Sequence, residues 1–354
     1  MYRDKDITEV LYAKSGHAPL LVDLRSPGEY RESTIPGALN VPLLDNVERS
    51  LVGITYKQDG PGKARELAME IVAPRLPQFI YDFKNIAPDR VVTVFCWRGG
   101  ERSHFAGCIL DAVGFKVNRV RGGIKAYRRH VLKYFCRELP HRAVVVYGLT
   151  GVGKTDLLLK LKDRGFPVLD LEGLAAHRGS VFGKIGQPPS PGQKMFEALI
   201  EYNLRRAEKN GFFLVECESR RLGNLFVPGS ILQAMHNGYR FLAYAPLRVR
   251  VERIKRAYIN GIAGNSSAFR DAVARLTKYI GKNRVVELNK WLDDGEFDKV
   301  VEFLLEHYYD PLYKYPSCPH ENYDLSVNME NVEEAARVIG SRLNSLLGHQ
   351  GPGR

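Results

Sequence analysis

One short segment constrains this chain more than any other. GLTGVGKT, residues 148–155, follows the apolar run AVVVY and precedes an amphipathic helical pattern. It fits G-x-x-x-x-G-K-[S/T], in which glycines let backbone N–H groups turn toward a phosphate. Lys154 would add a positive charge, and Thr155 is a candidate ligand for Mg²⁺. The residues expected to bind phosphate are Gly148, Thr150, Gly151, Gly153, Lys154 and Thr155.

Short apolar runs alternate with helical patterns on both sides of this loop, which predicts an α/β fold with parallel sheets. A helix is expected over 102–113, and Gly and Pro predict an irregular loop over 183–193. The expected strands lie within residues 19–26, 90–96, 115–123, 143–147, 166–171, 212–217 and 240–246.

The chain has 354 residues, which exceeds what one compact core usually supports. The pattern restarts near Pro140, so we expect one domain over 1–138 and a second over 139–345. Residues 346–354 are expected to form a frayed tail.

A cysteine loop is the second motif that carries chemistry. In FCWRGGERS, residues 95–103, Cys96 ends an apolar run, and Gly99 and Gly100 stand between Arg98 and Arg102. Loop N–H groups and a helix N-terminus at such a position stabilise a thiolate and an incoming oxyanion. A cysteine that is merely packed in the core needs neither the glycine pair nor the arginines. We therefore expect these five residues to form a reactive site.

The length of this loop leaves its chemistry open. Five residues separate Cys96 from Arg102, which is the C-x5-R spacing of cysteine phosphatases, whereas sulfurtransferase loops are usually one residue shorter. Against a phosphatase, Phe95 stands where that class commonly has histidine. The pocket is predicted to accept a phosphate-containing donor while keeping the transfer chemistry of a thiolate.

Acidic and basic residues near the phosphate loop suggest a further part of its site. An NTPase normally has a metal-binding Asp at the end of a neighbouring strand, but the strand at 212–217 offers Glu216, with Glu218 after it. A solvated connector and ordinary surface charges are the alternatives for this set, and no metal site is expected apart from the candidate Mg²⁺ site at Thr155. The candidates are Asp170, Glu172, His177, Arg178, Glu216, Arg220 and Arg221.

Positive charge is concentrated in one window. The net charge is +12, and residues 116–142 carry nine Lys or Arg against one acid, Glu138. Such a window favours a polyanionic partner such as a nucleic acid. Tyr127, Tyr134 and Phe135 are candidates for base stacking, although core packing is the alternative for each. The candidate residues for binding this nucleic acid are Arg119, Arg121, Lys125, Arg128, Arg129 and Lys133.

A helical pattern over 246–258 carries three further arginines. Arg250, Arg253 and Arg256 fall largely off its apolar stripe, as in the arginine-rich helix of small P-loop kinases, and an exposed basic helix is the alternative.

The remaining composition indicates a soluble intracellular protein. Five scattered cysteines without a C-x-x-C pair predict reduced thiols. No run of about 18 apolar residues is available to span a bilayer. We expect a cytoplasmic location and no membrane partner.

Three segments resemble the rhodanese family over roughly residues 5–135: DLRSPGEYRESTIPGALNVP (23–42), FCWRGGERS (95–103) and VRGGIKAYRR (120–129). With GLTGVGKT, DLEGLAAHRGS (170–180) and VECESRRLG (215–223) following in order, nearly the whole chain resembles the bacterial tRNA 2-selenouridine synthases. The resemblance implies a rhodanese-like parallel sheet with flanking helices, followed by a P-loop NTPase-like α/β domain.

The resemblance also implies an activity. That family replaces the sulfur of wobble 2-thiouridine in tRNA with selenium from selenophosphate, by way of S-geranylation with geranyl diphosphate. Cys96 would then handle selenium, and the loop ending at Lys154 and Thr155 would bind the prenyl diphosphate. Two other hypotheses remain: a cysteine phosphatase fused to a kinase-like P-loop domain, and a non-catalytic, nucleotide-gated RNA-binding protein.

Overall fold

The computed structural model describes residues 2–13, 19–178, 187–262 and 266–347. The chain divides into two compact units, Met1–Cys136 with Glu197–Leu199, and Arg137–Phe196 with Ile200–Arg354. The division falls two residues before the boundary expected from the sequence. Most of the expected tail, 348–354, lies outside the described residues.

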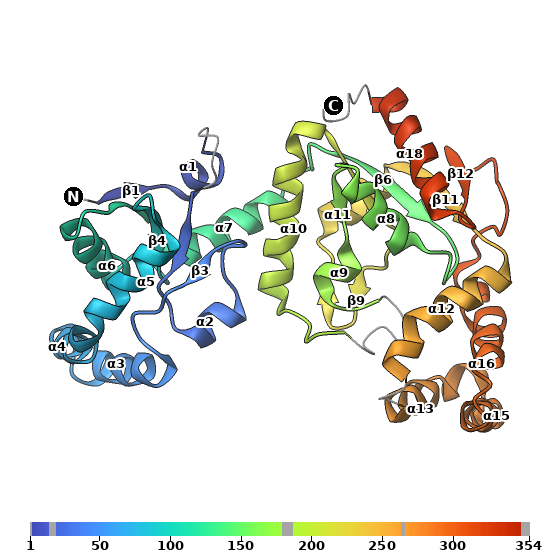
Figure 1. The fold of residues 1–354 in the computed structure, drawn as a ribbon, viewed down its shortest axis with the longest axis horizontal. Helices are drawn as coiled ribbons and strands as arrows, with labels where there is room; N and C mark the ends of the chain where they lie inside the picture. The colour runs from blue at the N-terminus through green and yellow to red at the C-terminus, as the bar shows by residue number, and fades with distance from the viewer. Residues whose placement is uncertain (1, 14–18, 179–186, 263–265, 348–354) are drawn as a thin grey trace. The chain divides into compact units, whose positions relative to one another are not determined.

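The first unit is built on a five-stranded parallel sheet in the order β1-β5-β4-β2-β3 (Figure 1). β4 is the run VVTVF, whose branched side chains favour a pleated strand and are buried from Val92 onward. The strands are β1 Arg3–Lys5, β2 Leu21–Asp23, β3 Leu39–Asn40, β4 Val91–Phe95 and β5 Lys116–Val120.

Helices flank this sheet, and two of them begin with capping boxes. Ser26 and Glu29 cap α2, while Asp45 and Glu48 cap α3. One face of the sheet packs on a core that includes Val22, Val94 and Phe83. The helices are α1 Ile7–Leu11, α2 Pro27–Glu32, α3 Asn46–Gln58, α4 Pro61–Val72, α5 Leu76–Ile86, α6 Glu101–Ala112 and α7 Gly123–Phe135, with a 3₁₀ turn Ala73–Arg75.

The second unit has its own five-stranded parallel sheet, in the order β12-β11-β6-β8-β7. β6 is central, and the strands that follow it lie on both of its sides, so its carboxyl end is a switch point where α/β proteins bind ligands. The strands are β6 Arg142–Tyr147, β7 Val168–Leu169, β8 Phe212–Glu216, β11 Tyr239–Tyr244 and β12 Leu325–Asn328; a small antiparallel hairpin adds β9 Arg221–Leu222 and β10 Leu225–Phe226.

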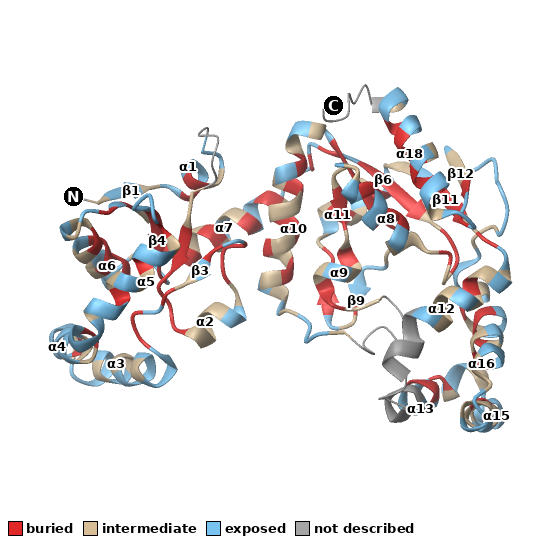
Figure 2. Cartoon of the chain, viewed as in Figure 1, coloured by how far each residue is buried: buried red, intermediate tan, exposed pale blue. Residues whose placement is uncertain are grey.

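The helices that pack around this sheet enclose a buried core of aliphatic and aromatic side chains (Figure 2). They are α8 Lys154–Asp163, α9 Leu171–Ala175, α10 Gln193–Ala207, α11 Gly229–His236, α12 Leu247–Ile262 and α18 Val332–Leu347, with a 3₁₀ turn Glu208–Asn210. Residues 187–192 of the expected irregular loop have no regular structure, and 183–186 lie outside the described residues.

A helical segment between α12 and β12 was not predicted from the sequence. It forms an apolar cluster of its own, around Val273, Leu288 and Leu304, against which Val251 and Ile254 of α12 pack. Its elements are α13 Ser266–Arg275, α14 Thr277–Ile280, α15 Lys282–Asp293, α16 Phe297–Leu304, a π-helical turn Leu305–Tyr309 and α17 Asp310–Tyr313.

Two sequence expectations concern the whole chain. All five cysteines are free thiols. Among the residues that the structure describes, every helix is too short or too polar to cross a bilayer.

Candidate functional site

The predicted phosphate loop connects the carboxyl end of β6 to the start of α8. Gly148 has a φ of 151°, and a Cβ there would lie 2.3 Å from the carbonyl oxygen of Ala243, so only glycine fits. The Lys154 ammonium donates to the carbonyls of Gly148, at 2.8 Å, and Leu149, at 3.4 Å. The loop is therefore folded tightly around the lysine that would meet a phosphate.

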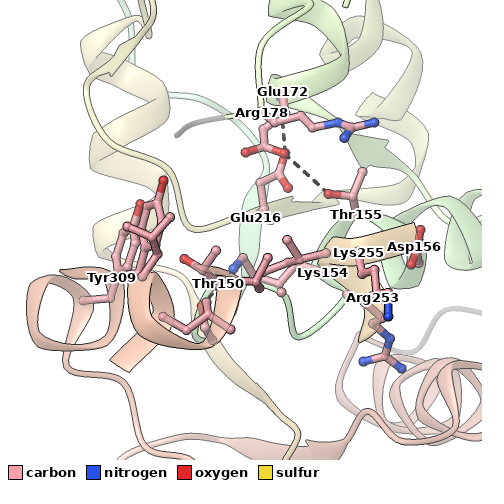
Figure 3. A pocket seen from close by; sticks show the side chains of 18 of the residues that line it. Thr150, Lys154, Thr155, Asp156, Glu172, Arg178, Glu216, Arg253, Lys255 and Tyr309 are labelled. Carbon is pink, nitrogen blue, oxygen red and sulfur yellow. Dashed lines mark hydrogen bonds between the residues drawn. The ribbon is translucent and has the colours of Figure 1, made fainter. Parts of the chain in front are cut away.

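A cavity of about 470 Å³ opens beside this loop (Figure 3). Lys154, Thr155 and Arg253 are among the residues that line its polar part. Another part of the lining comes from α15, α16 and the π-helical turn, and is apolar: Leu292, Phe297, Val300, Val301, Leu304, Leu305 and Tyr309. One cavity thus combines a phosphate-binding loop with a hydrocarbon wall.

Three carboxylates meet next to Thr155. Oxygens of Glu172, Glu216 and Glu218 lie within 4.8 Å of one another. Glu216 is buried and accepts from the backbone N–H of Glu172 at 3.2 Å, and Glu172 accepts from the Thr155 hydroxyl at 3.5 Å (Figure 3). Sequence reasoning placed Glu218 only at a strand end, because nothing local shows that it turns back toward Glu172.

The crowding of these acids shifts their titration. Burial and repulsion by Glu218 raise the pKa of Glu172 to about 8, and burial and repulsion by Glu216 raise the pKa of Glu218 to about 7. Burial, with Glu172 nearby, also raises the pKa of Glu216 well above its usual range. Carboxylate and hydroxyl oxygens are ligands that Mg²⁺ prefers, so this group fits the cation expected at Thr155.

Other predicted residues of the second unit divide between the cavity and its surroundings. Arg178 lines the cavity, whereas Asp170 caps α9 by accepting from the N–H of Gly173 at 2.8 Å. His177 packs against Gly223 in the β9–β10 hairpin. Arg221 belongs to that hairpin too and donates to the Gly223 carbonyl at 2.7 Å; it and its exposed neighbour Arg220 do not line the cavity.

Two arginines of α12 support the phosphate loop. Arg250, 2% exposed, donates from Nε to the carbonyl of Thr150 at 2.8 Å and forms two hydrogen bonds with Asp310, at 2.9 and 2.5 Å. Arg253 donates to the carbonyl of Val152 at 2.6 Å. The alternative of an exposed basic helix is therefore wrong for Arg250. Only a tertiary contact could reveal this role.

In the first unit, Cys96 lies directly after β4 and is 3% exposed. Its Sγ lies 3.3 Å from the Ser103 hydroxyl. The Cys96 carbonyl accepts from the N–H of Ile124 at 2.9 Å, and the Trp97 carbonyl accepts from the N–H of Lys125 at 3.2 Å. The start of α7 therefore holds the cysteine loop in place.

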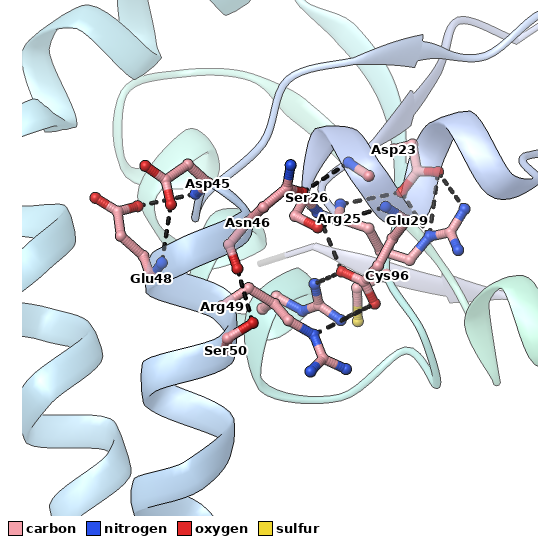
Figure 4. A network of polar contacts seen from close by, with 12 residues as sticks. Asp23, Arg25, Ser26, Glu29, Asp45, Asn46, Glu48, Arg49, Ser50 and Cys96 are labelled. Carbon is pink, nitrogen blue, oxygen red and sulfur yellow. Dashed lines mark hydrogen bonds and ion pairs between the residues drawn. The ribbon is translucent and has the colours of Figure 1, made fainter.

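The two arginines of the loop have different surroundings. Arg98 is exposed, whereas Arg102 donates to the Glu29 carboxylate at 2.7 and 3.3 Å. Burial alone would raise the pKa of Glu29, but the hydrogen bond and charge of Arg102 outweigh it and hold that pKa below its usual value. Glu29 also accepts from the N–H of Ser26 at 3.1 Å (Figure 4). Arg102 is thus engaged by a carboxylate rather than open to a ligand.

Three of the six predicted tRNA-binding residues form ion pairs within the protein. Arg119 pairs with Asp4 at 2.7 Å, and Arg121 pairs with Asp6 at 3.3 Å. Arg128 pairs at 2.5 Å with Glu197, which belongs to the same compact unit. Lys125 is half-buried, and Arg129 and Lys133 are exposed on α7.

The aromatic candidates in this window turn out to be packed. Tyr127 and Tyr134 are each 2% exposed, and Phe135 packs against an apolar cluster. The alternative of core packing is confirmed for these three.

Comparisons with known proteins match both parts of the chain to known families. The family model described as "tRNA 2-selenouridine synthase AAA domain" matches residues 141–342, and the one described as "Rhodanese-like domain" matches residues 7–130. The predicted order of a rhodanese-like sheet and a P-loop α/β domain is confirmed.

Curated relatives extend over most of the chain. The tRNA 2-selenouridine synthase of Nitrosomonas europaea is 32% identical over 342 residues, covering 83% of this chain and 88% of that protein. The protein of the same name from Cupriavidus necator is 34% identical over 330 residues, with coverage of 83% and 87%. The chain belongs to the tRNA 2-selenouridine synthase family.

Proposed function

We propose that this chain replaces the sulfur of wobble 2-thiouridine in tRNA with selenium from selenophosphate, through an S-geranylated intermediate made with geranyl diphosphate. The observation that carries the proposal is the cavity of the second unit, which joins a phosphate loop to an apolar wall. A nucleotide would need polar partners for its ribose and base, whereas Phe297, Val300 and Leu304 offer hydrocarbon contacts. A prenyl diphosphate has the matching distribution of charge and hydrocarbon.

In the geranyl transfer, the thiocarbonyl sulfur forms a bond to the first carbon of the prenyl chain. The bond from that carbon to the diphosphate oxygen breaks, and the uridine N3 proton is released. Negative charge develops on the leaving diphosphate, where the loop N–H groups and Lys154 would stabilise it. The apolar wall excludes water that would otherwise capture the reactive carbon.

Thr155, Glu172, Glu216 and Glu218 would hold a Mg²⁺ ion, either directly or through bound water. When bound, it would supply further charge neutralisation to the diphosphate.

Selenium transfer is assigned to the first unit. Cys96 would position the selenium that selenophosphate delivers, without a change of oxidation state. Selenium attacks C2 of the S-geranylated uridine, so that a C2–Se bond forms, the C2–S bond breaks and geranylthiol leaves, while water cleaves the Se–P bond and releases inorganic phosphate. The buried sulfur beside Ser103 supports a protected reactive group. Because Glu29 engages Arg102, this arginine is not open to a phosphate, which disfavours the phosphatase hypothesis. The exposed Arg98 and the loop N–H groups, rather than Arg102, would meet the phosphate of selenophosphate.

Nucleoside mass spectrometry of 2-thiouridine tRNA, incubated with both donors, tests the assignment. Lys154→Ala should prevent geranylation, whereas Lys160→Ala, which removes an exposed lysine from the same helix, should not. Cys96→Ser should let geranylated tRNA accumulate without 2-selenouridine, and Cys108→Ser, an exposed thiol on α6, should react like the unmodified protein.

Two outcomes would contradict the proposal. If Lys154→Ala and Cys96→Ser block the same step, the two units do not divide the reaction. If the unmodified protein forms 2-selenouridine at the same rate without geranyl diphosphate, the cavity does not serve a prenyl donor.

A further inference from the structure

Two tyrosines at the end of α17 line the cavity beside the carboxylates. Tyr313 and Tyr315 have nearly parallel rings, with an interplanar angle of 17° and centroids 6.0 Å apart. Lys314 between them has a left-handed conformation, φ 55° and ψ 28°, which is uncommon for a residue other than glycine. This turn sets the orientation of the two rings, and the left-handed backbone of Lys314 costs free energy that the rest of the fold must supply.

The inner tyrosine of this pair is held from several sides. The Tyr315 hydroxyl lies 3.2 Å from the Cys217 sulfur, and its ring meets that of Tyr147 edge to face at 5.7 Å. Tyr147 in turn meets Tyr323, and the guanidinium of Arg240 lies 5.4 and 4.9 Å from the centroids of those two rings. Tyr315 is therefore part of a fixed aromatic and cationic cluster at the carboxyl end of β6.

The outer tyrosine, Tyr313, is not buried in the core. Tyr313 is 38% exposed, although it lines the cavity, while the apolar wall for a hydrocarbon chain is already supplied by α15, α16 and the π-helical turn. A flat ring that is partly exposed and lies nearly parallel to a fixed neighbouring ring suits a ligand with two apolar faces and polar edges. A nucleobase has this chemistry, and base stacking on aromatic side chains is worth about 1–3 kcal/mol.

We propose that Tyr313, backed by Tyr315, is the stacking seat for the acceptor nucleobase of the RNA substrate. The inference rests on the proposed function, because it supplies the acceptor side of the cavity that holds the prenyl donor. An RNA base rather than the base of a free nucleotide is favoured, since Arg240 and Lys314 are exposed near the tyrosines, where a phosphate backbone can be neutralised.

The test uses the full-length protein and an anticodon stem–loop with 2-aminopurine at the wobble position, whose fluorescence falls when the base stacks. The unmodified protein should quench the probe. Tyr313→Ala should leave it bright and weaken binding by about tenfold, which corresponds to 1.4 kcal/mol. Tyr313→Phe should behave like the unmodified protein, as should Leu312→Ala, which removes an exposed neighbour that does not line the cavity. Thermal unfolding verifies that each variant is folded.

Three results would overturn this role of Tyr313. The Tyr313→Ala variant could quench the probe fully, or Tyr313→Ala and Leu312→Ala could lose equal affinity for the stem–loop. Alternatively, ATP could abolish the quenching while an unlabelled stem–loop does not. The last would assign the ring to a nucleotide base. The fluorescence readout needs no geranyl transfer, so an inactive but quenching protein would contradict the proposed function and leave the seat supported.

Discussion

The cysteine loop offers a sharp test, because two of its neighbouring glycines differ in what surrounds them. Gly123, at the start of α7, has a φ of 54°, and a Cβ added there would lie 2.2 Å from the Cys96 carbonyl oxygen and 2.7 Å from the Gly99 nitrogen. Gly100 has a φ of −98°, and a Cβ there would meet nothing within 4 Å. Gly123→Ala and Gly100→Ala are thus a matched pair.

The cost of Gly123→Ala follows from these contacts. A left-handed backbone costs a residue with a Cβ about 1–2 kcal/mol. The Cys96 carbonyl must also retreat by roughly 1 Å, which weakens the hydrogen bond that it accepts from Ile124. The same displacement of the loop weakens the bond that the Trp97 carbonyl accepts from Lys125, and each bond is worth about 1 kcal/mol. We expect a loss of about 3 kcal/mol in the free energy of unfolding. At about 3 °C for each kcal/mol, the melting temperature of the unit should fall by about 10 °C.

Thermal unfolding and peptide-resolved iodoacetamide labelling measure both consequences. Gly123→Ala should lower the melting temperature and expose Cys96 to the reagent, because the carbonyl that anchors the cysteine has moved. Gly100→Ala should change neither. Equal melting temperatures for the two variants would refute the reasoning, since the close approach of Gly123 to Cys96 is its basis.

Two further predictions concern the second unit. Arg250→Lys keeps the charge but cannot form hydrogen bonds with Thr150 and with both oxygens of Asp310 at once. It should raise the KM for the diphosphate donor about tenfold and leave the KM for RNA unchanged. Steady-state kinetics with each substrate varied measures the two constants, and an equal change in both KM values would contradict the prediction. Burial raises the pKa of Glu172 to about 8 and that of Glu218 to about 7, with added repulsion by Glu218 and Glu216 respectively. Their contribution to stability is therefore present below about pH 4.5 and is lost as the pH rises to about 8. The melting temperature of the ligand-free protein should therefore fall as the pH rises across that range, and Mg²⁺ should restore it most at pH 8. Glu218→Gln should make the melting temperature depend less on pH. An unchanged dependence in this variant would exclude the titration of these carboxylates as the cause.

Much of the fold and part of the site could be predicted because they depend on local backbone chemistry. The phosphate loop needs glycines at fixed positions before a lysine, and the strands are apolar, β-branched runs bounded by turn residues. The expected strand at 19–26 is shorter in the structure, Leu21–Asp23, because pairing with a neighbour sets where a strand ends.

The surroundings of the predicted charges could not be read locally. Arg102 meets Glu29, which lies 73 residues earlier, and Arg119 meets Asp4, 115 residues earlier. From the sequence alone, such arginines are expected to be free to bind an anionic ligand. Only the folded chain shows which carboxylate engages each one.

The sequence by itself predicted a reactive cysteine loop and contains the motif of a phosphate loop, since both are short motifs whose residues act through adjacent backbone. The tertiary structure decided what surrounds them. Parallel strands bring their carboxyl ends to one edge, so Glu172 after β7 and Glu216 on β8 meet Thr155 after β6. The apolar wall of the cavity belongs to a helical segment that follows the phosphate loop by more than a hundred residues. Its position could not be predicted locally, because hydrophobic burial does not depend on sequence separation.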